Sequence, residues 1–350
     1  MLRTLSLVLA LSATSCAAQS LPAETARKSD ACQRAIAMSD ADRGLAVLVL
    51  KDGEPVCSSP RSMLDQPHEL WSGTKSFLGI MAAIAVKDGL LSLDEPAAAT
   101  LTEWQDDPQR EKITLRHLLS MTSGHKSRVG RPPGYGKAVA SDITAPPGSR
   151  FLYGPVPSQI FGEVMRRKLQ ASGKSGGPKE YLEERLFAPL GIENYKWRNG
   201  PDTKPLMPQG VVMSARDWAK FGEFVHSGGR IEGDRIVDPD TFESLFEGSA
   251  ANAAYGLSWW LPRTSQSEDA VTATTDIDDH ADLLPADMVV AAGAGDQRLY
   301  VIPSLGVTIV RLAELDLAAV LRGDQGKWSD YEFIQLALEA VDTESQTPSN

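Results

Sequence analysis

Glu69-Leu-Trp-Ser-Gly-Thr-Lys-Ser-Phe-Leu-Gly-Ile-Met-Ala-Ala-Ile-Ala-Val-Lys87 opens with polar residues and becomes a nearly unbroken apolar run. The pattern predicts a buried helix that stops at Gly89. In such a helix Ser72 and Lys75 lie one turn apart on the same face. A serine at the first turn, with a lysine kept neutral by apolar neighbours, is a candidate nucleophile and base.

The composition of the whole chain is that of a globular protein with a large core. The chain has 350 residues, of which 42% are hydrophobic and 23% are charged. This suits one large domain or two closely packed lobes. The formal net charge of −11 argues against a nucleic-acid partner, which would require clustered Lys and Arg.

Residues 1–18 have the features of a secretory signal peptide: a short positive start, an apolar stretch too short to span a bilayer, and small residues at the end. Two processing routes are open. Signal peptidase could cut after Ala17 or Ala18. Alternatively, Ala13-Thr-Ser-Cys16 is a loose lipobox, and Cys16 would become a lipidated N-terminus. Both routes predict an exported, periplasmic protein. A membrane contact is expected only by the second route, through the lipid anchor on Cys16.

Cys32 and Cys57 are the two cysteines that remain after the signal region. In an oxidising compartment such a pair is expected to form a disulfide, which would stabilise the fold by about 3 kcal/mol. The alternative is two unrelated buried thiols. Neither cysteine has the histidine neighbour that catalytic cysteine chemistry needs.

Five strand-like runs lie near the two ends of the chain and predict one antiparallel sheet. Residues 30–342 are expected to form a single domain of class α/β (α+β), with a mainly helical insert at about 90–282. The predicted strands are Gly44–Leu50, Pro55–Cys57, Met288–Ala292, Arg298–Ile302 and Gly306–Leu312. The predicted helices, besides the one at Ser72, are Asp30–Ala41, Thr114–Met121, Ser158–Gln170, Glu180–Leu190, Ser214–His226 and Trp328–Val341.

A Ser-x-x-Lys motif alone is a weak signal, and this chain contains it twice. The second copy, Ser123-Gly-His-Lys126, precedes a Gly/Pro-rich loop and has no apolar helix to bury its lysine. The surroundings therefore favour Ser72 over Ser123 as the nucleophile.

Several further motifs follow the first one in a fixed order. Together they resemble the serine β-lactamase-related family, which includes class C β-lactamases, D-alanyl-D-alanine carboxypeptidases, esterases and nylon-oligomer hydrolases. The resemblance runs from about Leu45 to Leu312. It rests on Ser72-Gly-Thr-Lys-Ser-Phe77, Gly89-Leu-Leu-Ser-Leu-Asp-Glu-Pro96, Ile113-Thr-Leu-Arg-His-Leu-Leu-Ser-Met-Thr-Ser-Gly124, Pro147-Gly-Ser-Arg-Phe-Leu-Tyr153, Met213-Ser-Ala-Arg-Asp217 and Gly293-Ala-Gly295.

This resemblance implies a β-lactamase/penicillin-binding-like fold and assigns three catalytic roles. Ser72 would be the acylated nucleophile, Lys75 its base or proton relay, and Tyr153 the residue that passes a proton to the leaving group. The oxyanion hole would combine the backbone N–H of Ser72 with that of a residue just after Gly295, which is either Asp296 or Gln297. No metal or other cofactor is implied.

The chain departs from the family pattern at two places. The family's Tyr-x-Asn motif reads Tyr153-Gly-Pro155, so a side-chain amide that contacts the lysine and the substrate is missing. The third motif, often Lys-Thr-Gly or His-x-Gly, reads Gly293-Ala-Gly295 and offers no cation or hydroxyl for a β-lactam carboxylate. Both departures argue against an antibiotic substrate.

The remaining candidate sites are weaker. The five histidines have no metal-ligand spacing. His125 follows Thr-Ser-Gly and is either a cleft residue or an ordinary loop residue. The acidic stretch Asp276-Ile-Asp-Asp-His280 is either a loose calcium site or a solvated loop. Trp259-Trp260 is either core packing or a cleft wall.

The sequence therefore predicts an exported serine hydrolase that cleaves a small-molecule ester or amide through an acyl-enzyme on Ser72. The alternative is a catalytically silent binding or sensor protein that keeps the fold. That second hypothesis is motivated by Pro155 and by the bare Gly293-Ala-Gly295.

Overall fold

The computed structural model describes residues 23–265, 275–318 and 328–341. The predicted signal peptide at residues 1–18, with Cys16, lies outside the described residues. Among the helices that are described, none combines the length and apolar character needed to cross a membrane.

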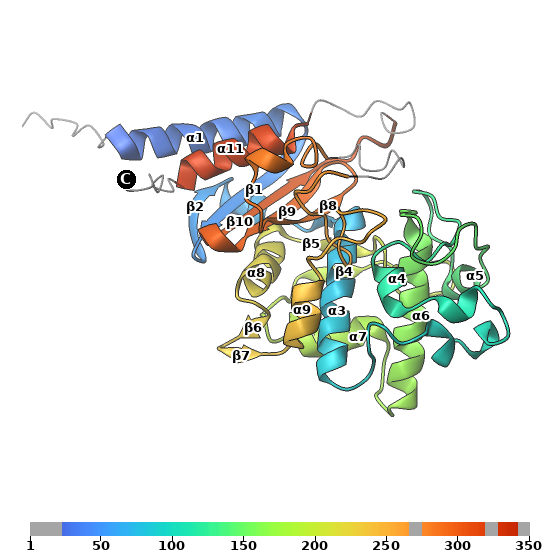
Figure 1. Ribbon diagram of the computed structural model, residues 1–350. Coiled ribbons are helices and arrows are strands. Elements are labelled where there is room, and N and C mark those ends of the chain that lie inside the picture. Colours follow the sequence, from blue (N-terminus) through green and yellow to red (C-terminus); the bar gives the residue numbers. More distant parts are fainter. Residues whose placement is uncertain (1–22, 266–274, 319–327, 342–350) are drawn as a thin grey trace, which may run out of the picture.

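A five-stranded antiparallel sheet forms the frame of the molecule (Figure 1). Its strand order is β2-β1-β10-β9-β8, which joins the two ends of the chain in one sheet as predicted. The register pairs Val49 of β1 with Ile309 of β10. The strands are β1 (Gly44–Lys51), β2 (Glu54–Ser58), β8 (Val289–Gly293), β9 (Gln297–Ile302) and β10 (Val307–Ala313).

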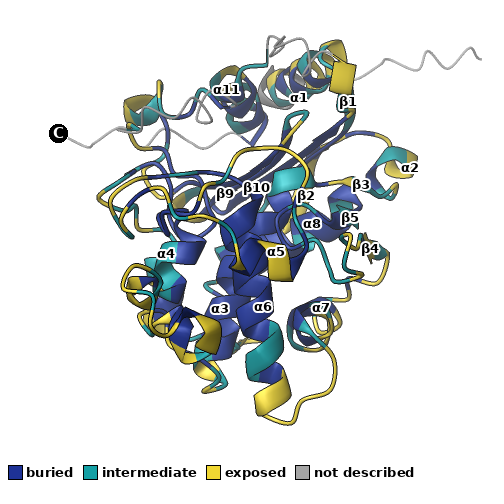
Figure 2. Ribbon diagram, turned by 90° about the vertical axis from the view of Figure 1, so that its right-hand side faces the viewer, coloured by how far each residue is buried: buried dark blue, intermediate teal, exposed yellow. Residues whose placement is uncertain are grey.

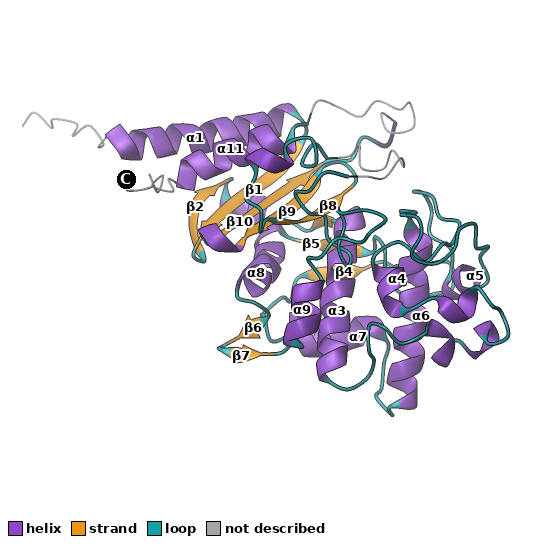
Figure 3. Ribbon diagram, in the orientation of Figure 1, coloured by secondary structure: helices purple, strands orange, loops and turns teal. Residues whose placement is uncertain are grey.

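Both faces of this sheet are covered by helices, which is why β1 reads as a continuous apolar run (Figure 3). Val47 and Val49 face the layer made by α1 (Ala23–Ala41) and α11 (Asp330–Val341). Ala46, Leu48 and Leu50 belong to the larger core on the other face, with α8 (Ala215–His226) and α3 (Ser76–Lys87).

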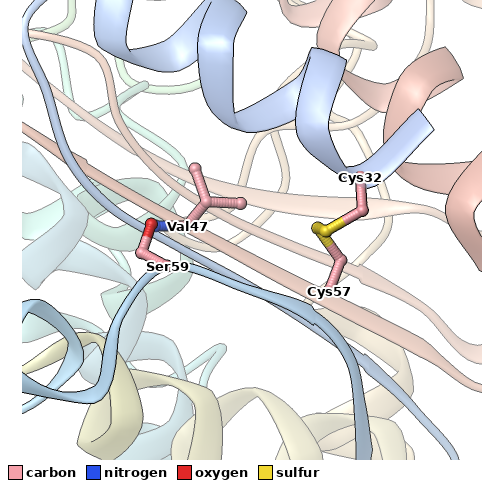
Figure 4. Close-up of a disulfide and its surroundings, with 4 residues drawn as sticks. All are labelled: Cys32, Val47, Cys57 and Ser59. Atoms are coloured by element: carbon pink, nitrogen blue, oxygen red, sulfur yellow. A yellow bond between two sulfur atoms is a disulfide. The ribbon is translucent and has the colours of Figure 1, made fainter. Parts of the chain in front are cut away.

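A disulfide between Cys32 and Cys57 fastens α1 to strand β2, with the two Cα atoms 5.4 Å apart (Figure 4). The predicted pairing is confirmed. Beside it, the hydroxyl of Ser59 accepts a 2.9 Å hydrogen bond from the N–H of Val47, so β1 is tied to the chain that follows β2.

The segment between the two halves of the sheet is mainly helical, but it also contains strands that the sequence pattern did not indicate. Besides α3 and α8, its described α-helices are α2 (Arg61–Leu64), α4 (Leu115–Leu119), α5 (Tyr135–Val139), α6 (Pro155–Ala171), α7 (Pro178–Leu182) and α9 (Pro239–Ser244). A small sheet has the order β3-β5-β4, and β6 pairs with β7. These strands are β3 (His68–Glu69), β4 (Tyr195–Trp197), β5 (Val211–Met213), β6 (Arg230–Ile231) and β7 (Asp234–Arg235).

Several predicted helices differ in their bounds. The helix expected from Asp30 begins at Ala23, and the one expected at Thr114–Met121 covers only Leu115–Leu119. The helix expected at Ser158–Gln170 begins three residues earlier, at Pro155, because proline is well suited to the first position of a helix. The helix expected at Glu180–Leu190 is α7 followed by a π-helical turn at Glu183–Phe187. Nothing in the apolar spacing distinguishes these two helix types.

The stretch around Ser72 is a 3₁₀ turn (Trp71–Lys75) that leads directly into α3. Helix α3 runs through the centre of the molecule and is buried on nearly all sides from Ser76 to Ala85 (Figure 2). A helix that is apolar all round is expected in such a position. The Ser-Lys pair therefore lies where the central helix reaches the sheet.

Candidate active site

The 3₁₀ turn that carries Ser72 is held between β5 and β8. Leu70 donates a 3.0 Å backbone hydrogen bond to Val211 of β5, and Val211 donates one of 3.1 Å to the hydroxyl of Thr74. On the other side Gly293 of β8 lies against the turn. A Cβ atom at Gly293 would be 2.0 Å from the carbonyl oxygen of Leu70, so only glycine fits there.

Lys75 and Ser72 form the pair predicted from the sequence. The Nζ atom of Lys75 lies 3.0 Å from the Oγ atom of Ser72. Lys75 is only 3% exposed. Burial lowers the pKa of its amine to about 7, because the charged form loses its hydration. A neutral amine at this distance can accept the proton of the Ser72 hydroxyl.

The second hydrogen-bond partner of Lys75 is a backbone group that sequence reasoning missed. The amine donates a 3.2 Å hydrogen bond to the carbonyl oxygen of Pro208. Pro155, at the first turn of α6, cannot supply the amide of the family motif, because proline has no side-chain amide. Every residue type has a backbone carbonyl, so nothing in the sequence could have indicated that of Pro208.

Tyr153 joins the pair from the segment just before α6. Its ring centroid lies 4.7 Å from the Nζ atom of Lys75, and its hydroxyl hydrogen-bonds with Ser72. Burial raises the pKa of Tyr153 to about 12, while the bond to Ser72 and the charge of Arg298 act in the opposite direction. Tyr153 is therefore protonated at neutral pH and can serve as a proton donor.

An aromatic cluster fixes the ring of Tyr153. Trp260 lies 5.4 Å from it between centroids, Tyr255 lies 5.8 Å away at an angle of 85°, and Phe151 lies 6.1 Å away. All three are buried. Trp259 lies on the other side of the sheet, in the larger core with Phe221. The predicted Trp pair is thus core packing, and Trp260 also supports a site residue.

The predicted oxyanion residues have other contacts in the structure. A Cβ atom at Gly295 would lie 2.8 Å from the Cα atom of Leu315. Asp296 forms an ion pair of 3.2 Å with Arg298. The side-chain amide of Gln297 donates a 2.7 Å hydrogen bond to the carbonyl oxygen of Ala313 and accepts one of 3.0 Å from the N–H of Ala313. Their role in an oxyanion hole stays a prediction. Gly293 of β8 packs against Leu70 and Gly73, on either side of the nucleophile in the sequence.

The second Ser-x-x-Lys motif does not form a comparable pair. Ser123 is buried, and its hydroxyl bonds to Nδ1 of His125 at 3.0 Å. Lys126 is exposed. His125 is 0% exposed and packs 5.4 Å from Trp104, so it is a core residue of this loop. Burial lowers the pKa of His125 to about 4.

The acidic stretch expected to be either a calcium site or a solvated loop is used within the fold. Asp276 accepts hydrogen bonds from the hydroxyl of Ser329 at 2.6 Å and from the N–H of Tyr331 at 3.1 Å. The ring of His280 stacks on Tyr331 at 4.3 Å. Within the described ranges, no three His, Cys, Asp or Glu side chains gather in a way that could hold a metal ion.

Comparison with known proteins decides the family. A family model described as Beta-lactamase matches residues 33–322. This chain belongs to the beta-lactamase family. The fold agrees: a candidate beta-lactamase from Bacteroides dorei is similar over 89% of this chain and 98% of its own, with a TM-score of 0.70 and 19% identity. The expected fold class is confirmed.

Two curated relatives extend the comparison. An uncharacterized protein of Alkalihalophilus pseudofirmus is 24% identical over 71% of this chain and 73% of its own length. The lovastatin esterase of Penicillium rubens is 28% identical, but the alignment covers 47% of this chain and 48% of the esterase. By family and relatives, the chain is a serine hydrolase of the beta-lactamase type.

Proposed function

We propose that this protein hydrolyses an uncharged ester or amide through an acyl-enzyme on Ser72. The observation that carries the proposal is the Ser72–Lys75 pair: the two reacting atoms are 3.0 Å apart, and burial brings the pKa of the lysine to about 7. A base whose pKa lies near the working pH is the most efficient kind.

In the proposed first step, each proton transfer and each bond change can be assigned to Ser72, Lys75 or Tyr153. The Ser72 hydroxyl passes its proton to Nζ of Lys75 as Oγ forms a bond to the substrate carbonyl carbon. The resulting tetrahedral adduct loses its leaving group, which takes the proton of the Tyr153 hydroxyl. The Lys75 ammonium then returns a proton to Tyr153. Water attacks the ester on Ser72 in the second step and releases the acid.

Hydrogen-bond parity along β8 supports Ala294 as the second oxyanion donor, together with the N–H of Ser72. Val290 exchanges both backbone bonds with Trp260 at the outer edge of β8. Alternate residues of a strand point to the same edge, so the N–H of Ala292 is directed there, and Ala294, which directly follows the last residue of β8, would continue this alternation. Gly293 and Gln297 are opposite each other in the β8–β9 register, so the N–H of Gln297 is used between these strands.

The residues around the pair support an uncharged substrate. The strand that passes the nucleophile ends with Ala292 and Gly293, and Ala294 follows in the turn. None of these three residues carries a cation or a hydroxyl. The lovastatin esterase among the relatives cleaves an ester, which agrees with this class of substrate. We also propose that the protein is exported to the periplasm, and the disulfide is the structural support.

Turnover of a panel of nitrophenyl esters, nitroanilides and nitrocefin by the purified protein tests the proposal, with Ser72→Ala as control. We expect hydrolysis of short neutral esters, little or no turnover of nitrocefin, and no activity in the variant. Efficient turnover of nitrocefin would contradict the substrate class. Loss of all turnover in the wild type would favour a binding protein instead.

A further inference from the structure

We infer that Gln159 is a positioning residue for Lys75 and that it acts through the Met207–Pro208 peptide. The inference rests on the proposed function, because it concerns the base of that same site. Gln159 lies on α6 and touches neither Ser72 nor Lys75 in any hydrogen bond of the described residues.

The amide of Gln159 connects two loops inside the protein. Its Nε2 atom donates a 2.6 Å hydrogen bond to the carbonyl oxygen of Pro133. Its Oε1 atom accepts a 3.0 Å hydrogen bond from the N–H of Met207. The side chain is 0% exposed, so both bonds are shielded from water. A buried amide bonded on both sides holds its partners rigidly, because each lost bond leaves an unpaired polar group.

The next residue along the chain touches the base. The carbonyl oxygen of Pro208 accepts the 3.2 Å hydrogen bond from Nζ of Lys75. Gln159 thus fixes one end of a short peptide whose other end contacts the amine. Packing supports the same loop, since a Cβ atom at Gly162 of α6 would lie 2.6 Å from the Met207 side chain. Any larger residue at position 162 would displace that side chain.

The position of Gln159 explains how the site manages without the family's amide. Pro155 stands where the family motif has asparagine, and Gln159 follows four residues later on the same helix face. In this chain an amide therefore lies one helical turn beyond position 155. At position 155 it would meet the lysine directly, whereas at position 159 it holds a backbone carbonyl that meets the lysine.

The consequence can be measured on the amine itself. Burial is the cause of the low pKa of Lys75. The Met207–Pro208 peptide is part of the shell that keeps water away, and both residues are buried. Among the described residues, the side chains that contact the Lys75 amine are Ser72 and Tyr153. The pKa of Lys75 is shifted by burial, with no contribution from a described carboxylate. Loosening the peptide admits water, so the pKa of Lys75 rises toward its ordinary value of 10.5.

The test compares the full chain with Gln159→Met, which replaces the amide by an apolar chain of similar length. Lysine labelled with carbon-13 at Cε is titrated by NMR, and the Lys75 resonance is assigned by its loss in Lys75→Arg. We expect the Lys75 midpoint to rise by about one pH unit or more. Gln105→Leu removes another glutamine-to-carbonyl bond, from Gln105 to Ala98, and is expected to leave the midpoint unchanged.

A second variant reaches the same peptide from its other end and covers the case in which Gln159→Met does not fold. Pro208→Gly keeps the carbonyl and frees the backbone, and the Lys75 midpoint should again rise. An unchanged midpoint in folded Gln159→Met, or in Pro208→Gly, would overturn the inference. The titration does not require turnover, so its result stands even if Ser72 proves not to be a nucleophile.

Discussion

Lys75 places its Nζ atom 3.0 Å from Oγ of Ser72 while remaining 3% exposed. The short distance and the burial act together. The distance allows direct proton transfer, and the burial makes the amine neutral enough to receive the proton. Because the pair is only three residues apart on one turn, the geometry is fixed by local structure.

The first prediction concerns the pH dependence of acylation. The rate of reaction with an ester or a fluorophosphonate should rise with pH through a midpoint of about 7 and then stay level to pH 10, because only neutral Lys75 accepts the proton. Tyr153 does not add a falling limb in this range, since its pKa is about 12. Stopped-flow acylation between pH 5 and pH 10 measures the profile, and a flat profile would contradict the role of Lys75.

The second prediction concerns stability. The pKa of Lys75 is about 7 in the folded chain and 10.5 ordinarily, so the unfolded chain binds more protons between these values. The free energy of unfolding therefore gains about 1.4 kcal/mol per pH unit from this group in that window. Lys75→Met should be inactive and more stable than the wild type at pH 7. Its free energy of unfolding should not show this rise with pH. Urea unfolding at pH 7, 8 and 9 compares the two proteins, and equal slopes would count against a buried neutral lysine.

The third prediction concerns the approach of β8 to the nucleophile. Gly293→Ala should reduce acylation by roughly a hundredfold or more, because its Cβ atom would press against Leu70 and move the proposed donor of Ala294 away from Ser72. Gly136→Ala is the matched control, since a Cβ atom there meets nothing within 4 Å. Acylation rates and melting temperatures are measured for both. A fully active Gly293→Ala would show that the strand has no role in catalysis.

The fourth prediction concerns the disulfide. Cys32→Ala combined with Cys57→Ala should lower the free energy of unfolding by about 3 kcal/mol, because the bridge closes a loop with a sequence separation of 25. Activity at 25 °C should persist, since the bridge joins α1 to β2 and touches no site residue. Denaturant unfolding with and without reductant measures the effect. If reductant leaves the wild-type midpoint where it was, the cysteines are not bridged.

Much of the fold could be predicted because its signals are local. Strands β1 and β8 are nearly continuous apolar runs, and the helix after Ser72 is apolar on all sides. The sequence from Ser72 into this helix also predicted that Ser72 and Lys75 lie one turn apart on the same face. The π-helical turn at Glu183–Phe187 and the three residues of β4 gave no periodic signal of their own, because tertiary packing selects them.

The parts of the site that sequence reasoning missed are made by backbone groups. The carbonyl of Pro208 owes its position to loop geometry, and almost any residue type offers the same atom. The same holds for the N–H of Ala294, which we propose as an oxyanion donor. The register of the β8–β9 turn is the clearest case. Counting from Gly295 suggested Asp296 or Gln297 as the oxyanion donor, which stays a prediction. The contact of β8 with the turn of the nucleophile occurs at Gly293, two residues before Gly295.

Mass spectrometry can locate the adduct that a fluorophosphonate probe forms on the protein and so identify the nucleophile. We expect one adduct per wild-type chain, on the peptide that contains Ser72, and no adduct on Ser72→Ala. Equal labelling of wild type and variant, or an adduct on Ser123 of the second motif, would contradict the account.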